Sequence, residues 1–213
     1  MRIPSKKECY RLIYESNMME HIVVHSFQVC RVSLMIVDHI DIEGTALNRD
    51  LVQASAMLHD ITKTRSFQTK ESHDKTGAKF LSELGYPEVG NIVRQHVVLD
   101  EYFLPEFPTE AEIVNYSDKR VLHDQVVSLK ERENYILERY GAEPIYRQRI
   151  RMLWRQTEKL EKKLFNCLPF SPAEMNLELA GTKDFFPEFL TFRSNHQPDE
   201  ASKARKYPQQ QFS

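Results

Sequence analysis

The sequence predicts an all-α fold, and three observations support that class. Apolar residues recur at helical spacing through the first two-thirds of the chain, as Ile22, Val29 and Ile36 do. The alternation typical of strands is weak, and six glycines in 213 residues are few for a turn-rich β fold. With 41% hydrophobic and 28% charged residues, the composition is that of a soluble globular protein.

Capping residues define the helices expected in the first half of the chain. Ser5, Asn48 and Ser72 are suitable N-caps, and Pro87 suits a first helical turn. The polar segment 62–70 is expected to be a loop. The expected helices cover residues 5–16, 19–41, 48–60, 73–84 and 87–97.

The next segment, 99–108, contains two prolines and three aromatic residues and is expected to be a loop. Its aromatic residues, Tyr102, Phe103 and Phe107, either cap the core or stack on a bound base, and core capping is favoured. Thr109 is a suitable N-cap for the helix that follows.

Two further helices are expected over residues 122–139 and 143–167. The second has a stripe of leucine and isoleucine residues. This stripe either closes the bundle or forms the contact between two copies in a homodimer.

The composition changes after Leu168, because five of the ten prolines lie in the last 45 residues. We therefore expect a helical domain over residues 1–168 and an irregular, Pro-rich C-terminal extension over residues 169–213. Within the extension, the aromatic stretch 185–189 is expected to pack on the body or on a partner. The last residues, 207–213, are expected to form a loose terminus.

Charge and cysteine content exclude several classes of function. The formal net charge of −2 gives no strong case for nucleic-acid binding. The three cysteines are far apart and form no CxxC motif, which disfavours a disulfide framework and a zinc ribbon. No secretory leader and no apolar run long enough to span a membrane is recognisable, so a cytoplasmic location without membrane contact is expected.

The most informative feature is a set of imidazoles and carboxylates on helix faces that are otherwise apolar. His25, His59, His96 and Asp118 each share a face with aliphatic residues, and Asp60 follows His59 directly. A carboxylate that faces the core is costly unless it is paired or bound to metal. Ligands that converge from several helices of a bundle are typical of a metal centre. The ion would be Fe, Mn, Co, Ni, Zn or Mg, and one or two ions would bind.

Five motifs extend this set. They are HSFQV from His25, AMLHDITK ending at Lys63, HDKTGA from His73, IVRQH ending at His96 and YSDK around Asp118. Their order and neighbours resemble the HD-domain superfamily of metal-dependent phosphohydrolases over residues of about 20–140. The set is most similar to the binuclear branches, which include diadenosine-tetraphosphate hydrolases and cyclic-di-GMP phosphodiesterases. The Gly-Tyr-Pro motif of the latter is absent after His96, which argues against cyclic-di-GMP as substrate.

The resemblance implies a role for each residue. One metal would be held by four ligands: His25, His59, Asp60 and Asp118. Asp60 would bridge to a second metal held by His73 and His96, whose alternative role is that of substrate-facing or structural histidines beside a single metal. Asp60 and Lys63 are the expected catalytic residues, with Lys63 as a phosphate contact.

Three further cations and a second His-Asp pair are weaker candidates for site residues. Arg65, Lys119 and Arg120 lie near the expected ligands in sequence and are weaker candidates for binding an anionic substrate. The pair His123-Asp124 lacks a preceding apolar run and is expected on a helix surface or as a secondary contact to the site.

The expected function is hydrolysis of a phosphoester or phosphoanhydride bond in a small, anionic, nucleotide-like substrate by metal-activated water. The first alternative is a non-catalytic module of the same fold that binds metal and nucleotide as a sensor. An oxygenase on this scaffold is a further alternative, which no substrate-specific feature supports.

Overall fold

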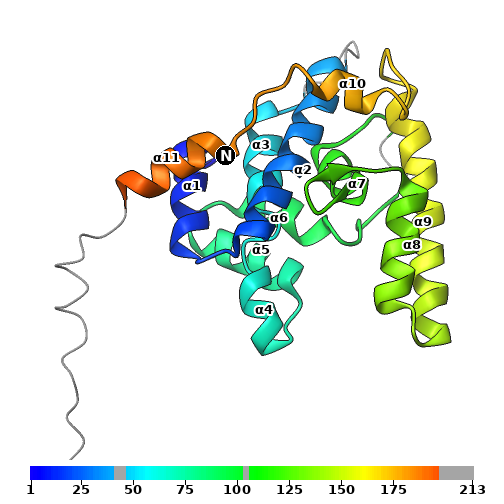
Figure 1. The fold of residues 1–213 in the computed structure, drawn as a ribbon, viewed down its shortest axis with the longest axis horizontal. Helices are drawn as coiled ribbons and strands as arrows, with labels where there is room; N and C mark the ends of the chain where they lie inside the picture. Colours follow the sequence, from blue (N-terminus) through cyan, green and yellow to red (C-terminus); the bar gives the residue numbers. More distant parts are fainter. Residues whose placement is uncertain (41–46, 103–105, 197–213) are drawn as a thin grey trace, which may run out of the picture.

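The computed structural model describes residues 1–40, 47–102 and 106–196. Helices dominate these residues, and the predicted all-α helical bundle is confirmed (Figure 1). The elements are α1 (Lys6–Glu15), α2 (Glu20–His39), α3 (Arg49–Leu58), α4 (Lys63–Thr69), α5 (His73–Glu83), α6 (Pro87–Gln95), α7 (Glu110–Arg120), β1 (Val121–Leu122), β2 (Gln125–Val126), α8 (Leu129–Tyr140), α9 (Pro144–Phe165), α10 (Met175–Leu179) and α11 (Phe186–Asn195).

Three helices begin at the polar residues that the sequence marks as caps. The side chains of Ser5 and Asn48 each accept a hydrogen bond from the backbone N–H of the third helical residue that follows. Thr109 and Glu112 form a capping box at the start of α7. These bonds satisfy donors that a helix start leaves unpaired, so local sequence determines where α1, α3 and α7 begin. Ser72 precedes α5, but its hydroxyl donates to Asp74 and does not cap the backbone.

The centre of the bundle is α2, which is buried along most of its length and packs against α3 and α7. The pair α5 and α6 packs against this core through contacts of α6 with α3 and α7. The helices α8 and α9 form a hairpin beside α7 (Figure 1). Trp154 and Leu160 of α9 are buried, so α9 closes the bundle, and its role in a homodimer stays a prediction. Among the described helices, none combines the length and apolar character needed to cross a membrane.

The expected loop at 62–70 is wrong, because α4 occupies most of it. None of the residues of α4 is buried, so the segment lacks the apolar periodicity from which a helix is predicted. Tertiary contact supports it instead. The hydroxyl of Thr62 donates to the carbonyl oxygen of His73 at 2.9 Å and lies 2.9 Å from the hydroxyl of Thr76, which ties the start of α4 to α5.

The expected helix start at 122 is also wrong, because α7 is followed by a two-residue β-hairpin and α8 begins only at Leu129. Val121 is buried with an extended backbone, which ends α7. His123 lies in the hairpin turn at a φ of 57°, in the left-handed region that a β-turn of this type requires. The pair His123-Asp124 is therefore in a turn and not on a helix.

The C-terminal extension is partly helical and packs on the N-terminal helices. Residues expected to be irregular form α10 and α11. Phe189 lies edge-on to Tyr10 and to Phe27, with ring centroids 5.7 and 5.6 Å apart, and Phe185 contacts Phe27 at 6.2 Å. The aromatic stretch therefore packs on the body, which is one of the two positions that the sequence left open. The boundary at residue 168 stays a prediction, and the expected loose terminus lies outside the described residues.

The aromatic residues of the 99–108 loop divide between core and solvent. Tyr102 packs against the core, which agrees with the favoured core capping. Phe107 is 45% exposed. Phe103 lies outside the described residues.

Candidate metal centre

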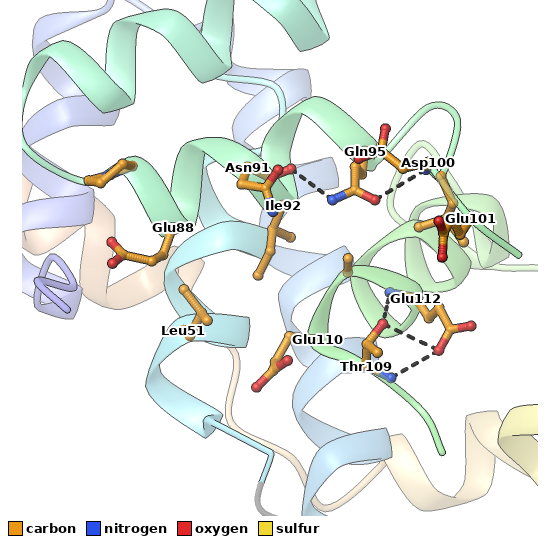
Figure 2. A pocket seen from close by; sticks show the side chains of 13 residues that line it. Leu51, Glu88, Asn91, Ile92, Gln95, Asp100, Glu101, Thr109, Glu110 and Glu112 are labelled. Carbon is orange, nitrogen blue, oxygen red and sulfur yellow. Dashed lines mark hydrogen bonds between the residues drawn. The ribbon is translucent and has the colours of Figure 1, made fainter. Parts of the chain in front are cut away.

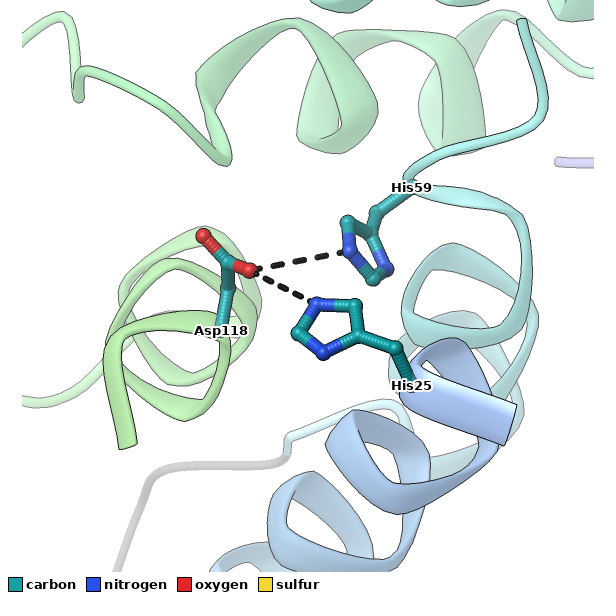
Figure 3. A group of neighbouring side chains, drawn as sticks. All are labelled: His25, His59 and Asp118. Carbon is teal, nitrogen blue, oxygen red and sulfur yellow. Dashed lines mark hydrogen bonds and ion pairs between the residues drawn. The ribbon is translucent and has the colours of Figure 1, made fainter. Parts of the chain in front are cut away.

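Three of the six predicted ligands meet between α2, α3 and α7. His25 comes from the first half of α2, His59 from the C-terminal end of α3 and Asp118 from the last turn of α7 (Figure 3). One carboxylate oxygen of Asp118 lies 3.1 Å from Nε2 of His25 and 3.7 Å from Nε2 of His59. We call these three residues the first ligand group.

Asp60 connects the first group to the other two predicted histidines. Its Oδ2 lies 3.5 Å from Nε2 of His59, and its Oδ1 lies 3.2 Å from Nε2 of His73 and 3.6 Å from Nε2 of His96. His73 is the first residue of α5, and His96 ends α6. Asp60, His73 and His96 form the second ligand group. All six predicted residues are therefore close together, with Asp60 between the two groups.

The orientation of the imidazoles is set by backbone carbonyls. Nδ1 of His25 lies 3.0 Å from the carbonyl oxygen of His123. Nδ1 of His59 lies 2.8 Å from the carbonyl oxygen of Ala56, and Nδ1 of His96 lies 2.6 Å from that of Val93. A carbonyl oxygen only accepts, so each Nδ1 carries the proton and donates it. Nε2 is then unprotonated in the neutral ring and faces the centre, as in histidines that ligate metals.

The donor set fits a divalent metal ion. His59 Nε2 and Asp60 Oδ1 are buried and have no hydrogen-bond partner within the described residues. Orphaned buried polar atoms of this kind are rare and call for a ligand. The N···O separations given above run from 3.1 to 3.7 Å. A metal ion with bonds of about 2.1 Å places neighbouring ligands about 3.0–3.4 Å apart, so little movement is needed to bind one.

Burial and charge set the protonation state of the group. Burial lowers the pKa of His25, and it lowers that of His96 to about 3, so both rings are neutral at pH 7. Burial would also lower the pKa of His59, but the adjacent carboxylates of Asp60 and Asp118 outweigh it and raise that pKa. Burial opposes ionisation of the two carboxylates, yet the neighbouring imidazoles and lysines hold their pKa values well below the usual range.

Lys63, the predicted phosphate contact, lies at the edge of the second group. Its Nζ donates to Asp60 Oδ2 at 2.8 Å, and its side chain is 31% exposed. Burial alone would lower its pKa, but the charge of Asp60 outweighs this and raises it, so Lys63 stays cationic. A cation that touches both the site and solvent is suitably placed to meet an incoming anion.

The three weaker cation candidates have other partners. Lys119 is buried and donates to the carbonyl oxygens of His96 and Asn115 at 2.8 and 3.2 Å. Arg120 pairs with Glu161 at 3.0 Å, and Arg65 pairs with Glu71 at 2.5 Å. The expectation that they bind substrate is therefore not supported by the positions of their side chains.

Asn115 is a site residue that the sequence analysis missed. Its side-chain nitrogen donates to the carbonyl oxygens of Gln95 and His96 at 2.8 and 3.0 Å. With Lys119, one turn later in α7, it fixes the end of α6 and thereby the His96 ring. The signal in the sequence was two polar residues spaced i and i+4 on the helix that carries Asp118.

A separate cavity of about 700 Å³ lies between α6 and α7 (Figure 2). Its walls include Glu88, Glu101 and Glu110. The side chain of Gln95 points into it and bonds to Asn91 and Asp100, while the next residue along the chain is the predicted ligand His96. Carboxylates disfavour an anionic substrate, so this cavity is not assigned to the metal centre.

Fold and site together define a class of protein, namely a helical bundle that gathers imidazoles and carboxylates for a divalent metal. Residues 22–121 match the family model described as HD domain, and all six predicted ligands lie within that range. Through this segment, just under half of the chain, the protein resembles the HD-domain superfamily of metal-dependent phosphohydrolases, as its motifs indicated. No curated protein and no solved structure matches it. The role of each ligand stays a prediction.

Proposed function

We propose that the protein hydrolyses a phosphoester or phosphoanhydride bond in a nucleotide-like substrate with the help of two divalent metal ions. The observation that carries this proposal is the position of Asp60. One of its carboxylate oxygens faces His59 and the other faces His73 and His96. A carboxylate with ligand groups on both sides is the arrangement that a bridging ligand needs.

The residues have distinct tasks in this proposal. The first ligand group and Asp60 Oδ2 would hold one ion, and the second group, which includes Asp60 Oδ1, would hold the other. When bound, such ions would supply a water of lowered pKa and a Lewis acid for the phosphoryl oxygen. The ammonium group of Lys63 binds a phosphoryl oxygen and stabilises the charge that develops there. In the reaction, water forms the new P–O bond, and the bond from phosphorus to the leaving oxygen breaks.

Binding of a small anion is supported by charge. Lys63 is a cation at the edge of the site, and Asp60 and Asp118 would be neutralised by the ions they bind. The nucleoside part of the substrate is carried over from the superfamily, and we propose it on that basis alone.

Turnover by metal-loaded protein tests the proposal. Protein purified without oxygen and loaded with Mn²⁺ or Fe²⁺ should release phosphate or a nucleoside monophosphate from at least one member of a nucleotide panel. Asp118→Asn should lose this activity. Asp124→Asn is the matched control, because Asp124 is the exposed acid of the second His-Asp pair. Saturable nucleotide binding without turnover of any panel member would instead favour the sensor.

Elemental analysis tests the number of ions. In the two-ion arrangement, His96→Ala should lose one metal equivalent and keep the other, because Nε2 of His96 faces Asp60 Oδ1 of the second group at 3.6 Å. Loss of both equivalents, or of neither, would contradict the division into two groups.

A further inference from the structure

A residue from outside the matched range reaches the surroundings of the proposed site. Arg132 belongs to α8, which follows the range 22–121. Its positive charge is close enough to act on both Lys63 and Lys119. Lys63 contacts the carboxylate of Asp60, and Lys119 directly follows Asp118 in α7. We call Lys63, Lys119 and Arg132 the cation cluster.

Arg132 contacts the β1–β2 hairpin through Tyr135, and the same hairpin supports His25. Its guanidinium carbon lies 5.7 Å from the centre of the Tyr135 ring. That ring is edge-on to His123, at 5.6 Å. The carbonyl oxygen of His123 in turn accepts the Nδ1 proton of His25 at 3.0 Å. A continuous series of contacts therefore connects Arg132 to the first ligand group.

The three members of the cation cluster differ in whether their N–H groups have hydrogen-bond partners. Lys119 is bound to carbonyl oxygens, and Lys63 is bound to Asp60. Nε of Arg132 is buried and has no hydrogen-bond partner among the described residues. A buried N–H without an acceptor is costly, and a guanidinium is suited to bind two oxygens of one phosphate group.

The charges near the site also favour a substrate with more than one anionic group. The cation cluster has three basic side chains, while the site has two carboxylates, Asp60 and Asp118. Divalent ions at the carboxylates would add to this excess. Cations gathered in a partly buried region repel one another unless an anion lies between them.

We propose that Arg132 binds a second phosphate group, next to the one that is attacked, so that the substrate is a phosphoanhydride. This inference rests on the proposed phosphohydrolase function and narrows its substrate class. Lys63 would contact the phosphate that reacts, and Arg132 would bind two oxygens of its neighbour. Because α8 lies beyond the matched range, this contact would be a specificity feature of this chain.

Binding of two inorganic probes to Mn²⁺-loaded protein tests the inference. The probes are inorganic phosphate, with one phosphorus, and methylenediphosphonate, which has two and lacks the oxygen bridge that would be hydrolysed. Wild type should bind the diphosphonate more tightly than phosphate. Arg132→Met should weaken diphosphonate binding about tenfold or more, the value of a charged hydrogen bond, and phosphate binding less than about threefold.

Two further variants separate binding from folding. Arg132→Lys keeps the charge but cannot bind two oxygens in parallel, so its loss should be intermediate. Arg139→Met is the matched control, because Arg139 lies on the same helix and stacks on Tyr140 at 5.8 Å. It should bind both probes as wild type does. Metal content and melting temperature, measured for all variants, should be unchanged.

Four outcomes would overturn the inference. They are equal binding of both probes by wild type, equal weakening of both by Arg132→Met, no effect of Arg132→Met, and the same loss in Arg139→Met. Wild-type turnover combined with any of them leaves the phosphohydrolase proposal standing and removes only the phosphoanhydride. Selective loss of diphosphonate binding in Arg132→Met without wild-type turnover would support the phosphate contact and refute hydrolysis.

Discussion

Replacing Asp60 with alanine should abolish the stabilisation of the protein by metal. The Asp60 side chain is 1% exposed, and its two oxygens lie 3.5 Å from His59 and 3.2 Å from His73. Because no other carboxylate among the six faces both ligand groups, its removal should weaken binding at both. Asp60→Ala should therefore retain neither ion after dialysis.

The magnitude follows from linkage between binding and folding. A ligand at about a thousandfold excess over its Kd stabilises the folded state by about 4 kcal/mol. For a chain of this size, each kcal/mol raises the melting temperature by about 2–4 °C. Saturating Mn²⁺ should therefore raise the melting temperature of wild type by about 8–16 °C and that of Asp60→Ala by about zero.

Differential scanning calorimetry of chelator-treated protein, with and without Mn²⁺, measures this shift. The shift is compared and not the absolute melting temperature, because Asp60→Ala also separates Lys63 from its partner at 2.8 Å. Asp124→Ala, which alters the exposed His-Asp pair, should shift as wild type does. An undiminished shift in Asp60→Ala would refute the assignment of Asp60 as a ligand.

Three more predictions concern Lys63, His96 and Gly90. Lys63→Met should keep the metal content of wild type and lower kcat about a hundredfold; loss of metal would instead give Lys63 a structural role. In the metal-free protein, burial holds the pKa of His96 at about 3. The unfolded chain therefore binds a proton that the folded state excludes, and stability should fall as the pH drops from about 6.5 towards 3, by up to about 1.4 kcal/mol per pH unit. Urea unfolding measures this slope, which should be smaller in His96→Phe. Gly90→Ala should cost about 1–3 kcal/mol in the same assay, because the new Cβ would lie 2.7 Å from the carbonyl oxygen of Ala78. Gly181→Ala, with no atom within 4 Å, is the control, and equal stability of the two variants would contradict the close packing.

The local part of the fold was accessible from sequence because its determinants are local. Ser5, Asn48 and Thr109 cap the helices that they were expected to cap. The inward position of His25 and His59 follows from helical periodicity, since each shares a face with aliphatic residues. These features depend on neighbours within one or two helical turns, which a single sequence contains.

The features that were missed depend on contacts between distant segments. The helix α4 has no buried face, and its start is tied by Thr62 to residues of α5. Lys119 was a weaker candidate for substrate binding because it follows Asp118, yet its ammonium group binds the carbonyl oxygen of His96, 23 residues away in sequence. The charge of Arg132 near Lys63 likewise arises from the placement of α8, which no motif encodes.

The contact of α11 with the opposite end of the chain has a consequence for how the protein can be shortened. Tyr10, Phe27 and Phe189 share one aromatic cluster, and Phe27 lies two positions from His25 on α2. A fragment that stops at residue 168 would leave two rings of this cluster facing water, at about 1.5–3 kcal/mol for each side chain that loses its cover. The helix α2, which carries His25, is thus stabilised by residues more than 150 positions later in the sequence. A fragment that stops at residue 168 should consequently be less stable than the intact chain.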